Sequence, residues 1–137
     1  MATKIISHRG RTSNESPDNT LQSIEDAIDL NIEMVEFDVR RTQDGQIVCF
    51  HDAEIDDTPL ISMSFPEVIK MNPQVPTLEQ VLRLAKGKIQ VDVDLKETGY
   101  ENAVINILLD YFEYDNFIVK SFNRQVIKRI KEIDSKV

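Results

Sequence analysis

The feature that most constrains this sequence is an alternation between short apolar runs and segments of helical period. The apolar runs are rich in β-branched residues and lie at residues 4–8, 34–39, 47–50, 89–95 and 117–121. Helical segments are predicted after a cap at Asn19 or Thr20 and at residues 77–86, 100–112 and 124–133, with one short helix near 65–71 in an otherwise irregular segment, 53–76. This alternation is typical of βα units that build a parallel sheet.

The bulk properties indicate one globular domain and exclude some partners. A chain of 137 residues with 41% hydrophobic content can bury a core, so we expect a single domain over residues 1–137. A net charge of −8 without a Lys/Arg-rich run argues against nucleic acid, although a single small phosphate remains compatible. Because neither a secretory leader nor an apolar stretch of about 18 residues is visible, we expect no transmembrane segment and a cytoplasmic location.

Two carboxylates interrupt the apolar run at residues 34–39. Strand residues two apart point to the same face, so Glu36 and Asp38 project together while the apolar residues around them project oppositely. Crowded, desolvated acids cost several kcal/mol, which a divalent cation would relieve. Ion pairs with Arg40 and Arg41 would relieve the same cost, and this strand alone does not decide between the two.

The pair Asp44-Gly45 lies between two strand-like runs and predicts a hairpin. If these two residues form the whole loop, Asp38 lies directly opposite His51, with the Cβ atoms about 5 Å apart. A longer loop would shift this register. In the two-residue case a histidine and two carboxylates converge, which packing alone seldom requires.

The chain contains two histidines, and each ends a strand-like run before a charged residue. His8 precedes Arg9, and His51 precedes Asp52. Histidine both donates and accepts protons near neutral pH, which suits acid–base or nucleophilic cleavage of a phosphoester. Either histidine taken alone is better interpreted as a structural residue, so the functional prediction depends on both histidines occurring together with the acids.

A further acidic pair lies in the run at residues 89–95. Asp92 and Asp94 share a strand face with Lys96. They form either a surface ion pair or a metal ligand beside a cation that holds phosphate. The second interpretation is favoured, because ligands gather at the carboxyl ends of strands in α/β proteins.

Seven short motifs lie between His8 and Lys96. They are His8-Arg9-Gly10, Ser16-Pro17-Asp18-Asn19-Thr20, Glu36-Phe37-Asp38-Val39, Thr42-Gln43-Asp44-Gly45, His51-Asp52, Pro76-Thr77-Leu78-Glu79-Gln80-Val81-Leu82 and Asp94-Leu95-Lys96. In order and spacing they resemble the glycerophosphodiester phosphodiesterase family. The Glu-x-Asp and two-histidine elements are far more specific than any lone short motif.

The resemblance implies a fold, an activity and a set of site residues. It implies an α/β TIM barrel, here a partial barrel with about the first five strands and their helices, and hydrolysis of glycerophosphodiesters to glycerol 3-phosphate and an alcohol in lipid metabolism. A hydroxyl of the glycerol moiety would attack phosphorus. The implied roles are general acid and base for His8 and His51, ligands of Ca²⁺ or Mg²⁺ for Glu36, Asp38 and Asp94, and phosphate binding for Arg9 and Lys96.

Two residues depart from the pattern of that family. Asp18 replaces the Glu of the usual Pro-Glu-Asn-Thr, and Asp94 replaces the Glu of the usual Glu-x-Lys. Each replacement keeps the negative charge but shortens the side chain by roughly 1.5 Å. We therefore expect the metal to bind more weakly, or through a water molecule.

The length also departs from that of a TIM barrel, which typically takes about 250 residues. We expect the C-terminal strands of the barrel to be missing, which leaves a strand edge and an apolar face exposed. The sequence is therefore interpreted as a truncated domain or fragment, or as one part of a barrel closed by self-association or by a second chain.

Three alternative functions follow from the same residues. A catalytically inactive partial domain would keep the local motifs without turnover. A related lipid phosphodiesterase would act on another alcohol group. A small acidic calcium-binding or interaction module is suggested by the net charge and by Asp56-Asp57, although the spacing of an EF-hand is absent.

Overall fold

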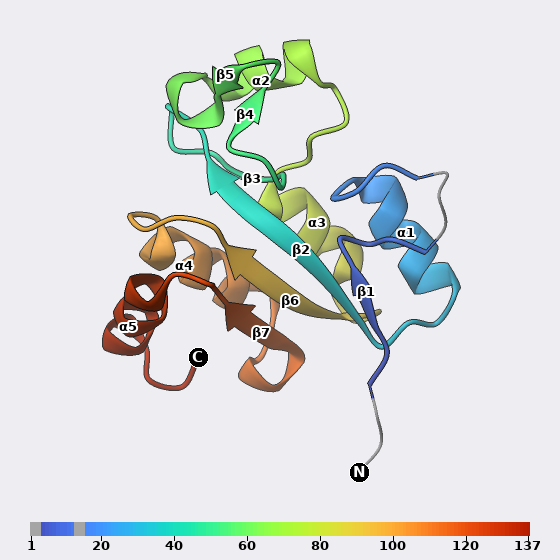
Figure 1. Ribbon diagram of the computed structural model, residues 1–137. Helices are drawn as coiled ribbons and strands as arrows, with labels where there is room; N and C mark the ends of the chain where they lie inside the picture. Colours follow the sequence, from blue (N-terminus) through green and yellow to red (C-terminus); the bar gives the residue numbers. More distant parts are fainter. Residues whose placement is uncertain (1–3, 13–15) are drawn as a thin grey trace.

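The computed structural model describes residues 4–12 and 16–137. Its main sheet has five strands at the predicted places: β1 (Ile6–His8), β2 (Met34–Arg41), β3 (Ile47–Cys49), β6 (Gln90–Leu95) and β7 (Phe117–Lys120). Four of them are parallel in the order β1-β2-β6-β7, and β3 pairs antiparallel with β2. Figure 1 shows the parallel strands with their carboxyl ends directed the same way.

The main helices follow the strands in the chain and cover one face of the sheet. They are α1 (Leu21–Asp29), α3 (Leu78–Ala85), α4 (Glu101–Tyr111) and α5 (Arg124–Ile133). Of the two predicted caps for α1, Thr20 is the N-cap, and its side chain accepts a hydrogen bond from the Ser23 N–H. Consecutive helices contact each other, so they form a single layer outside the sheet (Figure 1).

The core lies between this helical layer and the sheet. The strand residues that face the helices are apolar and completely buried: Val35, Phe37, Val39, Val91, Val93 and Leu95. They alternate with the acidic residues of β2 and β6, so the helices pack on the apolar face and leave the acidic face on the other side. Each fully buried side chain of this kind contributes about 1.5 to 3 kcal/mol of transfer free energy.

The hairpin between β2 and β3 has a longer loop than the two residues considered above. The Gly45 N–H donates to the Thr42 carbonyl oxygen at 3.1 Å, and Gly45 has a φ of 83°, as in three-residue hairpin loops. The register consequently shifts by one, and Asp38 pairs with Phe50, whose N–H donates to the Asp38 carbonyl oxygen at 3.0 Å. Of the two loop lengths considered, the longer one is therefore formed, and Asp38 does not lie directly opposite His51.

Residues 53–76 form a small cap above the end of β2 (Figure 1). The cap holds β4 (Glu54–Ile55), β5 (Thr58–Pro59), a short 3₁₀ helix (Leu60–Ser62) and the predicted helix α2 (Phe65–Met71). Its own core consists of Val48, Ile55, Leu60, Met63, Val68 and Val75. Asp56 and Asp57 both have positive φ and form the two-residue turn between β4 and β5, which gives this acidic pair a structural explanation.

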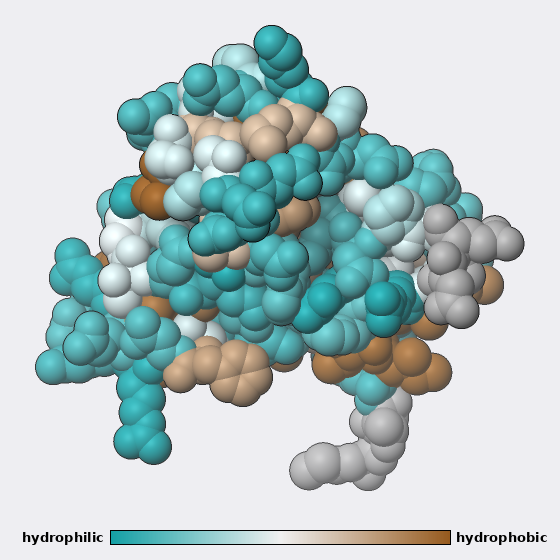
Figure 2. All heavy atoms as spheres, turned by 45° about the horizontal axis from the view of Figure 1, so that its top comes forward, coloured by the Kyte–Doolittle hydropathy of each residue, from teal (hydrophilic) through white to brown (hydrophobic). Residues whose placement is uncertain are grey.

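The outer strands of the sheet, β1 and β7, expose hydrophobic side chains. Ile6 is 46% exposed and Ile118 is 47% exposed, and Phe122 just after β7 is 96% exposed. Figure 2 shows a mostly hydrophilic surface with hydrophobic residues gathered along its lower edge. Within residues 4–12 and 16–137, no helix is long and apolar enough to cross a membrane.

Candidate active site at the carboxyl ends of the strands

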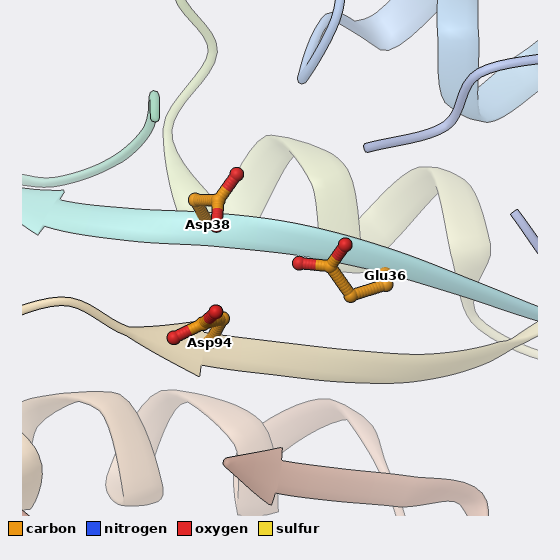
Figure 3. Close-up of side chains that lie close together, drawn as sticks. All are labelled: Glu36, Asp38 and Asp94. Atoms are coloured by element: carbon orange, nitrogen blue, oxygen red, sulfur yellow. The ribbon is translucent and has the colours of Figure 1, made fainter. Parts of the chain in front are cut away.

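The sheet brings the predicted site residues of three strands together. In the ladder His8 pairs with Glu36, and Asp38 pairs with Asp94. Because β1, β2 and β6 are parallel, these residues gather toward the same end of the sheet. Figure 3 shows the carboxylates of Glu36, Asp38 and Asp94 facing one another from β2 and β6.

These three carboxylates form a cluster that could hold a cation. One oxygen from each lies within 4.8 Å of the others, and the residues are 2%, 1% and 3% exposed. Among the described residues, Glu36 Oε1 and Asp94 Oδ1 are buried without a hydrogen-bond partner. Buried, unpartnered carboxylate oxygens are costly, and they are the ligands that Mg²⁺ and Ca²⁺ prefer. The donor set therefore fits a hard divalent cation.

Glu36 is the most perturbed acid of the cluster. Burial, followed by the negative charge of Asp38, raises the pKa of Glu36 to about 7. Its Oε2 lies 3.2 Å from His8 Nε2 and accepts a hydrogen bond from the Arg9 N–H at 3.3 Å. The histidine in contact with the acids of β2 is thus His8, and not the His51 that a two-residue hairpin loop would bring opposite Asp38.

Asp38 has a different environment although it is equally buried. Lys96 Nζ lies 2.8 Å from its Oδ1, and Asn19 Nδ2 donates to its Oδ2 at 3.1 Å. Burial alone would raise the pKa of Asp38, but the hydrogen bonds from Lys96 and Asn19 outweigh it and lower this pKa below its ordinary value. Asp38 is therefore ionised at neutral pH, where Glu36 is about half protonated.

The two predicted phosphate-binding cations lie against this acidic cluster. Lys96 bridges Asp38 and Asp94, with its Nζ 3.1 Å from Asp94 Oδ2. Arg9 Nε lies 3.5 Å from Asp38 Oδ2, and Arg9 Nη1 lies 3.3 Å from Asp18 Oδ2. The cations that balance Asp38 thus come from the loops after β1 and β6.

Arg40 and Arg41, the alternative partners considered for the acids of β2, contact other groups. Arg40 pairs with Glu97, and Arg41 Nη1 donates to the Gly99 carbonyl oxygen at 2.9 Å. The alternative in which Arg40 and Arg41 neutralise the acids of β2 is therefore wrong.

The loop after β1 presents His8 and Arg9 through unusual backbone geometry. Arg9 has a φ of 57° and Gly10 a φ of 72°. A Cβ atom on Gly10 would collide with the side chain of Ser23 in the first turn of α1. Glycine is required here because the backbone turns tightly and also lies directly against the helix.

His51 lies beside the cluster and is less firmly enclosed than the acids. It follows Phe50, the residue that pairs with Asp38, and its side chain is 40% exposed. Its ring Nδ1 lies 2.7 Å from Asp52 Oδ1. The structure thus places both histidines at the same end of the sheet, with His8 in contact with the acids and His51 at their margin.

Comparison with known proteins identifies the family of this chain. The family model described as the glycerophosphoryl diester phosphodiesterase family matches residues 8–137. The chain belongs to the glycerophosphoryl diester phosphodiesterase family. It is 32% identical to the Bacillus subtilis protein YhdW, over 94% of this chain and 61% of that protein.

Solved structures of glycerophosphoryl diester phosphodiesterases share the fold. A glycerophosphodiester phosphodiesterase from Agrobacterium tumefaciens superimposes with a TM-score of 0.89 at 23% identity, over 98% of this chain and 64% of that one. An Oleispira antarctica phosphodiesterase in complex with sn-glycerol-3-phosphate superimposes with a TM-score of 0.84 at 24% identity, over 97% of this chain and 63% of that one. The predicted partial TIM barrel is confirmed, and the chain spans less than two thirds of these proteins.

Some groups at this candidate site received no role from the sequence. Asn19 was considered only as a helix cap, yet its Oδ1 also accepts the Asp38 N–H at 3.1 Å. Its φ of 58° is a conformation that asparagine tolerates better than most residues, but that signal alone does not name a partner. Asp92 was grouped with Lys96, whereas its Oδ2 lies 3.3 Å from Lys120.

Proposed function

We propose that this chain carries the metal-binding and acid–base residues of a glycerophosphodiester phosphodiesterase, which releases glycerol 3-phosphate and an alcohol. The observation that carries the proposal is the convergence of Glu36, Asp38 and Asp94 with the His8 ring at one end of the sheet. The family membership supports the reaction class. The sn-glycerol-3-phosphate bound by the Oleispira antarctica relative supports the substrate class.

The proposed ligands of a divalent cation, Mg²⁺ or Ca²⁺, are Glu36, Asp38 and Asp94. A bound cation would neutralise the charge on the phosphate oxygens. Two of the three ligands contribute buried oxygens that lack a hydrogen-bond partner among the described residues, which supports this assignment. The third, Asp38, is held in place by Asn19 and Lys96.

The two histidines are the proposed acid and base. The Nε2 atom of His8 is close enough to Glu36 Oε2 for a proton to be held between them, and the His8 side chain is 69% exposed toward incoming substrate. The ring Nδ1 of His51 contacts Asp52, which directs its Nε2 away from that residue. One ring would take the proton of the attacking glycerol hydroxyl, and the other would protonate the departing alkoxide, which leaves a cyclic glycerol phosphate. Water would then open this cyclic ester with the roles of the two rings exchanged, which gives glycerol 3-phosphate.

Arg9 and Lys96 are the proposed phosphate-binding residues. Burial would lower the pKa of Lys96, but hydrogen bonds to Asp38 and then Asp94 outweigh it and raise this pKa, so the amine stays charged. A substrate phosphate could take over part of the contacts that these cations now make with the carboxylates. Charge-assisted bonds of this kind position the phosphorus for in-line attack.

The direct test is release of glycerol 3-phosphate from glycerophosphocholine with Mg²⁺ or Ca²⁺ present. We expect turnover by the unsubstituted chain, a loss of about 100-fold or more in Asp38→Asn and in His8→Ala, and loss on chelation. Asp57→Asn in the β4–β5 turn removes the same charge as Asp38→Asn and should keep full activity. Calorimetric binding of Mg²⁺ without any turnover would favour the inactive partial domain.

The exposed strand edges support a second, separate proposal about assembly. An uncovered strand edge is a template for pairing, and β1 and β7 both end the sheet with exposed isoleucines. We propose that a second copy or another chain covers these edges. Sedimentation of the chain at several concentrations tests this, and a monomer at every concentration would contradict it.

A further inference from the structure

The placement of His51 requires an explanation, because the sheet does not enclose it. β3 ends at Cys49, and His51 lies two residues beyond that end. Its side chain is 40% exposed, and the Asp52 carboxylate that contacts its ring is 71% exposed. An exposed contact of this kind does little to hold a side chain in one place, so the position of the His51 ring depends on how the backbone at residue 51 is fixed.

Arg40 fixes that backbone directly. Its Nε and Nη2 atoms both donate to the His51 carbonyl oxygen, at 2.9 Å and 2.7 Å. Its Nη1 atom pairs with Glu97 from the segment after β6. The guanidinium is thereby held on two sides, and the Arg40 side chain is only 11% exposed.

The origin of Arg40 links this contact to the carboxylate cluster. Arg40 follows Asp38 by two residues on β2, so the strand that carries two proposed metal ligands also holds the backbone of His51. Glu97 follows Lys96 directly, so its contact ties the same guanidinium to the end of β6. The distance between His51 and the acids is therefore set by two neighbouring strands rather than by the loop alone.

We propose that Arg40 is a positioning residue that holds His51 at the distance needed for proton transfer, with Glu97 orienting the guanidinium. This inference rests on the proposed function, in which His51 is an acid or base. The fork geometry is essential, because a lysine carries the same charge but cannot donate two in-plane bonds to one oxygen. A displacement of the ring by about 1 Å is enough to slow a positioned reaction by about 100-fold.

Arg41 provides a matched control on the same strand. It is also an arginine of β2 that donates to a loop carbonyl oxygen, at Gly99, and it packs over the Tyr100 ring. Within the described part of the chain, neither of these contacts involves His51. Arg41→Lys therefore removes a comparable structural contact without changing the support of the histidine.

Ring signals from nuclear magnetic resonance report on His51 directly, since the chain contains two histidines and a His8→Ala variant assigns both. In Arg40→Lys we expect the His51 ring signals to shift or broaden and those of His8 to stay in place. At saturating glycerophosphocholine and metal, kcat should fall about 10- to 100-fold with little change in KM. Glu97→Gln should produce a smaller change in the same direction, and Arg41→Lys should leave both readouts as in the unsubstituted chain.

Two results would overturn the proposal. One is a set of His51 ring signals that Arg40→Lys leaves unchanged, and the other is an equal fall in kcat for Arg40→Lys and Arg41→Lys. Failure of the proposed function looks different, because the unsubstituted chain would then show no turnover while Arg40→Lys still moved the His51 signals.

Discussion

The two faces of β2 are buried to the same extent but have opposite chemistry. On the face toward the helices, Val35, Phe37 and Val39 are completely buried among apolar side chains. On the other face, Glu36 and Asp38 are 2% and 1% exposed. The apolar face stabilises the fold, whereas the acidic face lowers stability unless cations compensate. A single strand thus separates folding from the proposed chemistry by alternating the direction of its side chains.

The largest expected effect on stability comes from shortening a side chain on the apolar face of β2. Phe37→Ala removes a completely buried ring, and we expect it to lower the free energy of unfolding by about 3 to 5 kcal/mol. Urea titration followed by circular dichroism measures the change. Leu21→Ala on α1, where the side chain is 37% exposed, should cost less than about 1.5 kcal/mol. Similar losses in both variants would show that the apolar face of β2 is not central to stability.

The acidic face should respond in the opposite direction. Glu36→Gln removes a buried charge, so we expect the metal-free chain at pH 8 to gain about 1 to 3 kcal/mol. The pKa of Glu36 is about 7 in the folded state, above its ordinary value of 4.5. The charge therefore does not affect stability below pH 4.5, destabilises the fold increasingly as the pH rises to 7, and has its full effect above that.

Thermal unfolding at pH 5 and pH 8 checks this sign. The gain from Glu36→Gln should be present at pH 8 and nearly absent at pH 5. Excess Mg²⁺ or Ca²⁺ should stabilise the unsubstituted chain at pH 8 and have little effect on the variant, since the cation would lose a ligand. A variant less stable than the unsubstituted chain at pH 8 would contradict the idea that this carboxylate is costly.

A smaller effect is expected where the acidic face meets β7. Burial raises the pKa of Asp92, and Lys120 opposes that rise through its charge. Lys120→Met removes the cation that lies 3.3 Å from the carboxylate and should lower stability at pH 7 by about 1 kcal/mol. Adding Asp92→Asn to Lys120→Met should restore most of the loss. A double variant no more stable than Lys120→Met would show that Asp92 and Lys120 are not coupled.

The smallest effect on stability is expected at the edge of the same face. Ile118 lies between the buried Phe117 and the partly buried Val119 and is itself 47% exposed, so Ile118→Lys should change the free energy of unfolding by less than about 0.5 kcal/mol. If β7 pairs with another chain, the charge should instead weaken association. Sedimentation velocity of the Ile118→Lys variant and the unsubstituted chain at equal concentration measures this. Unchanged association would rule out β7 as the strand that pairs with another chain.

The strands, and the acids that they bring together, could be predicted because their signals are local. A period of two places Glu36 and Asp38 on one face of β2, and Asp92 and Asp94 on one face of β6. Parallel pairing then brings them to one end, which requires only that the strands be neighbours. The helices α2 and α5 were predicted at the bounds observed for the same reason, since their capping and periodicity lie within the segments themselves.

The remaining features depend on contacts that the local sequence does not encode. The hairpin register was set by Thr42, whose hydroxyl accepts the Gln46 N–H at 3.0 Å and closes a loop one residue longer than Asp44-Gly45 suggests. The strands β4 and β5 are too short to give a periodic pattern. The roles of Asn19 and Arg40 depend on partners 19 and 11 residues away, which only the folded chain brings together.

The concentration of so many duties on β2 makes this strand intolerant of changes in length. Its first residues pair with β1 on one side, its residues 34–39 pair with β6 on the other, and its end pairs with β3. Deleting one residue near Met34 would move every following side chain to the opposite face, so that carboxylates would enter the apolar core and a phenyl ring would replace them in the acidic cluster. Insertions or deletions should therefore be tolerated in the Asp56-Asp57 turn but should prevent folding when they fall within β2. Evolutionary change in β2 should consequently occur mainly by point substitution.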